Sequence, residues 1–69
     1  MKINEKIKKI RELNNLSQDE MVEKLSLATS TYSKIERGLT EITLTRLEQI
    51  AKIFNMKTTE LLEANGQFV

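Results

Sequence analysis

The sequence contains neither cysteine nor histidine. Without cysteine there is no disulfide and no thiolate metal site, which suits a reducing cytoplasm. With histidine also missing, the usual metal ligands, acid–base groups and nucleophilic dyads are absent, so we expect no catalytic residues, no metal and no cofactor. No apolar run exceeds two residues, so neither a membrane span of about 20 residues nor a signal-peptide core is found, and we expect a soluble cytoplasmic protein.

The length and the charge of the chain limit its organisation. Its 69 residues are enough for one domain, expected over residues 1–69, with 65–69 as a tail, the start of a linker or the cut end of a longer regulator. The net charge is only +1, although residues 1–11 are basic and residues 12–23 are acidic. Any nucleic-acid surface must therefore be a local patch created by folding, and the alternative is a solvated mixture of surface charges.

The absence of proline and the presence of only two glycines favour helix nearly throughout. The spacing of Ile3, Ile7, Ile10 and Leu13 predicts one face of a first helix, which Asn14 and Asn15 interrupt. Ser17 to Glu20 is an S-x-x-E capping box, which predicts that a second helix begins there. Its apolar pattern stops near Ser26.

A third helix is predicted from Thr29 to Glu36, because Gly38 suits the left-handed conformation that closes a helix. At about 100° per residue, Ala28, Tyr32 and Ile35 share a narrow arc that we expect to be buried. Glu36 falls near the edge of this arc. The opposite face carries hydroxyls and cations, namely Ser30, Ser33, Lys34 and Arg37.

Two further helices complete the pattern. Thr43 is placed to cap a fourth helix that ends at Asn55, with an apolar stripe of Leu44, Leu47, Ile50, Ala51 and Phe54. A fifth begins at Thr58 or Thr59 and is closed by Asn65 and Gly66. The chain is thus predicted to be all-α, with five helices and no strand.

The second and third predicted helices carry the functional signal. Two short helices joined by a tight turn, the second with a buried arc and an opposing polar and basic face, have the geometry that lays a helix in the DNA major groove. Short hydroxyl side chains allow a close approach to the bases, Lys34 can reach guanine acceptors, and Arg37 can reach a phosphate.

The run LSQDEMVEKL at 16–25, followed by STYSKIERG at 30–38, resembles the lambda-repressor-like (Cro/repressor, or XRE) helix-turn-helix family. Residues 47–54 and 60–62 resemble that family's fourth and fifth helices, so the resemblance spans residues 3–63. It implies a compact five-helix domain with its helix-turn-helix at the second and third helices. It also implies a sequence-specific transcriptional regulator, a repressor that binds double-stranded DNA and is not an enzyme.

The resemblance assigns roles to individual residues. Thr29, Ser30 and Lys34 fall on base-reading positions, while Gln18, Thr31, Ser33 and Arg37 fall on positions that contact phosphate or sugar. Gln18 would also brace the recognition helix at 29–36; the alternatives are an exposed helix-start residue for Gln18 and a surface threonine for Thr31. Arg11 and Glu36 match a partly buried ion pair between the first and third helices, and two separate surface charges are the alternative.

Some positions depart from the family pattern or are ambiguous. Ser26 stands where the family prefers glycine, so it must accept a left-handed conformation or the turn must differ. Ala28 replaces a capping serine or threonine, unless Thr29 takes over that role. Tyr32 is expected to pack inward with its hydroxyl at the margin, the alternative being a phosphate contact. Solubilising charges are expected at Lys6, Lys8 and Lys9, the alternative being a contact of Lys8 or Lys9 with the DNA backbone.

A single recognition helix reads only a few base pairs, so we expect a homodimer on a near-palindromic operator. Candidate interface residues are Leu61, Leu62, Phe68 and Val69, with internal packing as the alternative for the leucines and a frayed tail for the last two. The competing function is an antitoxin or another protein-interaction module with the same fold, whose partner is a toxin or the C-terminal domain of a longer chain.

Overall fold

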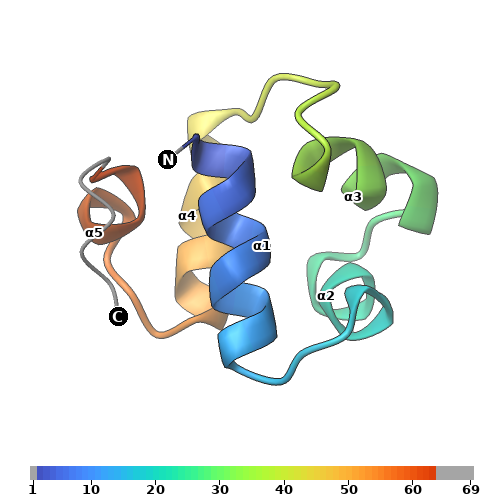
Figure 1. Ribbon diagram of the computed structural model, residues 1–69, viewed down its shortest axis with the longest axis horizontal. Helices are drawn as coiled ribbons and strands as arrows, with labels where there is room; N and C mark the ends of the chain where they lie inside the picture. The colour runs from blue at the N-terminus through green and yellow to red at the C-terminus, as the bar shows by residue number, and fades with distance from the viewer. Residues whose placement is uncertain (1, 64–69) are drawn as a thin grey trace.

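The computed structural model describes residues 2–63, which form five helices and no strand. The helices are α1 (Ile3–Leu13), α2 (Gln18–Leu25), α3 (Thr29–Glu36), α4 (Leu44–Ile53) and α5 (Thr58–Leu62). Figure 1 shows α1 and α4 at the centre, with α2 and α3 on one side and α5 on the other. The predicted all-α, five-helix fold is confirmed. Asn65 and Gly66, expected to close the last helix, lie outside the described residues.

Local side-chain chemistry begins two of the helices as the sequence predicts. At the start of α2, the Ser17 hydroxyl accepts from the Glu20 amide at 3.1 Å, and the Glu20 carboxylate accepts from the Ser17 amide at 2.8 Å. The Thr43 hydroxyl caps α4 by accepting from the Arg46 amide at 3.1 Å. These bonds satisfy amides that a helix leaves without an internal partner.

The first four helices end in the same way, with one residue in the left-handed conformation. These residues are Asn15, Ser26, Gly38 and Asn55, with φ between 56° and 73°. In each case the following amide donates to a carbonyl five residues earlier, as Leu39 does to Lys34 at 2.9 Å, which is the hydrogen bond of a Schellman motif. Ser26 therefore keeps the family's turn at a conformational cost of about 1–2 kcal/mol.

All five helices contribute to one core. Its buried apolar side chains are Ile7, Ile10, Met21, Leu25, Tyr32, Ile35, Leu47, Ile50, Ala51, Phe54 and Leu61. Helix α1 packs against α3 and α5, while α4 packs against α2 and α5. No helix within residues 2–63 combines the length and the apolar character that crossing a membrane requires.

Three apolar residues predicted to face the core are exposed instead. Leu13 is 60% exposed at the last position of α1, although Lys6 is buried on nearly the same side of the helix two turns earlier. Leu44 is 60% exposed, because it is the first residue of α4 and burial begins only at Leu47. Ala28 is exposed because it precedes α3 in an extended conformation, where the helical arc does not apply; it supplies no side-chain cap.

Lys6 is buried, so its prediction as a solubilising charge is wrong, whereas Lys8 and Lys9 are exposed. Its ammonium group donates to the backbone carbonyl of Glu60 at 2.9 Å and to that of Glu63. A cation at a helix C-terminus is stabilised by the carbonyls that end the helix. Lys6 therefore fastens α1 to the end of α5.

Candidate nucleic-acid interface

Helix α3 has an inner and an outer face of different character. Tyr32 and Ile35 point into the core, and Tyr32 is fully buried. The exposed residues are Thr29, Ser30, Thr31, Lys34 and Arg37, and Ser33 is half-buried. Ser30, Ser33, Lys34 and Arg37 therefore lie on the side of α3 that faces away from the core, and Thr29 and Thr31 lie at the two edges of that side.

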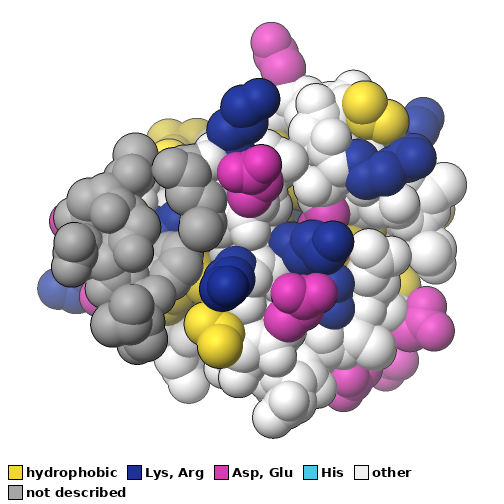
Figure 2. All heavy atoms as spheres, viewed as in Figure 1, with side chains coloured by type: hydrophobic (Ala, Val, Ile, Leu, Met, Phe, Trp, Pro, Cys, Tyr) yellow, Lys and Arg dark blue, Asp and Glu magenta, His cyan; other side chains and the backbone are white. Residues whose placement is uncertain are grey.

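The outer face of α3 carries positive charge without a compensating carboxylate. Neither Lys34 nor Arg37 forms an ion pair within residues 2–63, where the ion pair observed joins Arg11 to Glu36. Figure 2 shows basic side chains over α3, whereas acidic ones gather lower in the view, near the start of α2. Exposed cations without a partner on the same protein are available to bind phosphate or base acceptors.

The Glu36 carboxylate connects α3 to the two preceding helices. Arg11 of α1 donates to it twice, through Nε at 2.6 Å and through Nη2 at 3.2 Å. Gln18 of α2 donates through its amide at 3.1 Å, and the Tyr32 hydroxyl donates as well. The structure thus brings Arg11 and Glu36 together as a buried ion pair, as the resemblance implied.

These four groups form a charged network rather than a neutral one. Burial raises the pKa of Glu36, but hydrogen bonds from Arg11, Tyr32 and Gln18 outweigh burial and leave the pKa below its usual value. The hydrogen bond to Glu36 raises the pKa of Arg11, although burial opposes it. Burial and the bond to Glu36 raise the pKa of Tyr32. Glu36 is therefore ionised and Tyr32 is protonated at neutral pH.

Gln18 and Tyr32 both face this network. Gln18 is half-buried at the first position of α2, and its bond to Glu36 links the start of α2 to the end of α3. The Tyr32 hydroxyl was expected at the margin, with a phosphate contact as the alternative. It is instead enclosed and bonded to Glu36, because that carboxylate lies one helical turn further along the same inner face.

Asn4 is a positioning residue that the sequence did not reveal. Its side-chain amide donates to the backbone carbonyl of Glu36 at 3.0 Å, so α1 also holds the end of α3. A Cβ atom at Gly38 would lie 3.1 Å from the same amide nitrogen, and Gly38 has a φ of 73°. Glycine at this position thus satisfies two constraints: it adopts the left-handed backbone conformation, and it leaves room for the Asn4 side chain. Nothing in the local sequence marks a bond between residues so far apart.

The residues expected at a dimer interface are placed differently from one another. Leu61 is fully buried, so internal packing accounts for it, whereas Leu62 is 48% exposed. Phe68 and Val69 lie outside the described residues. Over residues 2–63, no group of three carboxylates is arranged to hold a metal ion.

Comparisons with known proteins agree with this geometry. Residues 7–61 match the model of a helix-turn-helix family, HTH_3. A solved structure described as a SinR protein/SinI protein complex is 29% identical, with a TM-score of 0.83, and the match covers 99% of this chain and 67% of that one. A crystal structure of SinR, described as the master regulator for biofilm formation, in complex with DNA is 32% identical, with a TM-score of 0.79, covering 90% and 100% respectively. Among curated protein sequences, none matches the chain significantly.

Replacing Glu36 by alanine is expected to lower the free energy of unfolding by about 3–5 kcal/mol, because it leaves the Arg11 charge buried without its partner. Glu41→Ala is the control, since Glu41 is exposed, and it should change stability by less than about 0.5 kcal/mol. Urea unfolding of both variants measures the difference. Equal midpoints would contradict a central role for the Glu36 network.

The free energy of unfolding should also change with pH in the acid range, because Glu36 titrates there. Its pKa lies below the ordinary 4.5 in the folded protein. The ionised Glu36 therefore contributes to the free energy of unfolding above pH 4.5, and this contribution is lost as the pH falls below that value. Glu36→Gln should therefore show a flatter loss of unfolding free energy than the wild type as the pH falls below about 4.5. Glu41→Gln is the matched control and should keep the wild-type profile. A wild-type profile for Glu36→Gln would show that this carboxylate is not the group that titrates.

Proposed function

We propose, from the premise that the chain belongs to the helix-turn-helix family HTH_3, that it is a DNA-binding transcription regulator whose α3 enters the major groove. The observation that carries this proposal is the division of α3. Its inner face is tied to α1 and α2 through Glu36, while its outer face offers hydroxyls and two cations that form no ion pair within residues 2–63. The SinR structure with DNA supports the same class of partner.

Thr29, Ser30 and Lys34 are proposed to face the bases. The major groove is about 12 Å wide and admits a helix with short outer side chains. Two of these residues carry only small hydroxyl groups, so direct discrimination rests on Lys34, which reaches the O6 and N7 acceptors of guanine. DNA shape contributes at positions that no side chain reaches.

The remaining polar residues are proposed to contact the DNA backbone. Arg37, at the C-cap of α3, provides a cation, and Thr31 and Ser33 provide hydroxyls for phosphate or sugar. Gln18 has one amide hydrogen bond to Glu36, and its position at the start of α2 places it beside α3. It is proposed to brace α3 and to contact phosphate together with the first amides of α2.

Two copies are proposed to bind a near-palindromic operator and to act as a repressor by occupying it. In such a dimer the two α3 helices enter successive major-groove faces about 34–36 Å apart. The exposed Leu62 of α5 is the described candidate for the contact between copies. The solved complex of SinR with SinI supports a protein partner as well as DNA.

Selection of bound sequences from a random DNA pool tests this proposal. The expected result is a short motif repeated with two-fold symmetry, its half-sites centred one helical turn apart. Selection of a motif without symmetry would contradict the dimer but keep DNA binding. No enrichment at low ionic strength would contradict the regulator and favour the protein-interaction alternative.

On the selected site, Lys34→Ala should cost about 1–3 kcal/mol of binding free energy and relax the preference at one base position in each half-site. Arg37→Ala should weaken binding to all DNA sequences alike. It should also reduce the slope of log affinity against log salt concentration by about one, the amount expected for one lost phosphate contact. Lys57→Ala is the control, because Lys57 immediately precedes α5, which lies on the far side of α1 from α3 (Figure 1). Fluorescence anisotropy at several salt concentrations measures all three, and identical effects for Lys34 and Arg37 would contradict their separate roles.

A further inference from the structure

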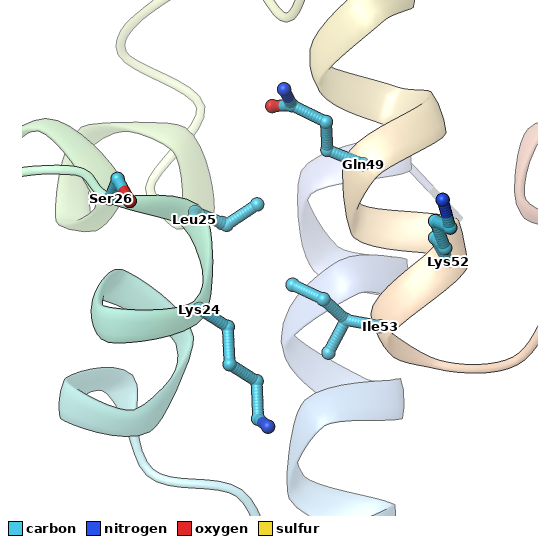
Figure 3. A pocket seen from close by; sticks show the side chains of 6 residues that line it. All are labelled: Lys24, Leu25, Ser26, Gln49, Lys52 and Ile53. Carbon is cyan, nitrogen blue, oxygen red and sulfur yellow. The ribbon is translucent and has the colours of Figure 1, made fainter.

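A groove of about 520 Å³ lies between the C-terminal end of α2 and the second half of α4. Its lining residues are Lys24, Leu25, Ser26, Gln49, Lys52 and Ile53, and we name it the Lys24–Lys52 groove. In Figure 3, Leu25 and Ile53 extend into the space between the two helices, and Lys24 runs along one edge. None of its lining residues is among those proposed to contact DNA, and it lies at the end of α2 opposite Gln18, so this surface is separate from the proposed DNA interface.

The rim of the groove is positively charged. Two lysines line it and no carboxylate does, although acidic and basic residues are almost equal in number over the whole chain. Both lysines are exposed, and neither forms an ion pair within residues 2–63. The side-chain carbonyl oxygen of Gln49 accepts from Arg46 at 2.8 Å, and its NH2 group has no acceptor among residues 2–63. Lys24, Lys52 and Gln49 therefore all offer hydrogen-bond donors, which complement carboxylates.

The floor of the groove is apolar. Leu25 is buried in the core and Ile53 beside it is half-buried, so an aliphatic or aromatic side chain laid there would remove the remaining apolar surface of Ile53 from water. A small ligand would be poorly enclosed here, because pockets for small molecules bury about 70–90% of the ligand. An extended segment of another protein can cover the floor and reach both lysines at once.

We infer that the Lys24–Lys52 groove docks an acidic segment of a partner protein, with an aliphatic or aromatic side chain over Leu25 and Ile53 and carboxylates on the two lysines. This binding goes beyond the proposed function, because it neither uses α3 nor requires DNA. The same molecule can hold such a partner while α3 occupies the major groove, which gives the regulator a second, protein-directed contact.

Selection of peptides from a random phage-displayed library against the 69-residue chain tests the inference directly. We expect enrichment of Asp or Glu on both sides of a Leu, Ile or Phe residue. A selected peptide should bind Lys24→Glu/Lys52→Glu at least tenfold more weakly than the wild type. The matched control, Lys9→Glu/Lys57→Glu, makes the same change of charge outside the groove and should lose less than twofold.

Further measurements separate docking from other effects. Thermal melting of both double variants, together with Lys24→Gln/Lys52→Gln, checks that loss of binding is not loss of folding. Amide chemical-shift changes on addition of the peptide should cluster at residues 24–26 and 49–53. Each of four results would overturn the inference. These are no enrichment, selected peptides without acidic residues, equal affinity for the Lys24→Glu/Lys52→Glu variant, and chemical-shift changes centred on α3. DNA affinity is measured in a separate titration, so failure of one proposal is distinguishable from failure of the other.

Discussion

The arrangement of the first three helices depends on one buried carboxylate. Glu36 receives hydrogen bonds from Arg11 of α1, Gln18 of α2 and Tyr32 of α3. A buried charge is tolerated only when partners compensate its loss of hydration, so this network demands that the three helices meet in one arrangement. Because Glu36 is the last residue of α3, the network fixes where that helix ends and which side of it turns outward.

The proposed recognition surface follows from this constraint. The inner residues of α3 are buried or hydrogen-bonded, and Asn4 also holds the carbonyl of Glu36, so the helix is supported at its C-terminal end from α1. Side chains on a well-supported helix present their polar groups with little freedom to move relative to the core. The short hydroxyl residues and Lys34 on the outside are thus carried on a rigid element, which suits the reading of base edges.

Two basic surfaces on this molecule differ in what they can bind. The outer face of α3 combines cations with small hydroxyl residues, a chemistry that suits the phosphates and base edges of a duplex. The Lys24–Lys52 groove combines cations with the apolar side chains of Leu25 and Ile53, and a nucleic-acid backbone offers little apolar surface to cover them. Both surfaces are basic, so charge alone does not distinguish them. The neighbouring side chains do, because they are hydroxyls on α3 and apolar groups in the groove.

Interactions between near neighbours could be predicted from the sequence, because the groups that form them lie within a few residues of one another. The Ser17 and Glu20 cap, the Thr43 cap and the left-handed turn at Gly38 are of this kind, and the family resemblance added the pairing of Arg11 with Glu36. The bond from Asn4 and the burial of Lys6 depend on partners 32 to 57 residues away. The groove depends on the packing of α2 against α4, and the exposure of Leu44 depends on where the core ends. Such contacts exist only once the helices have packed, since sequence periodicity specifies the face of a helix but not what lies opposite it.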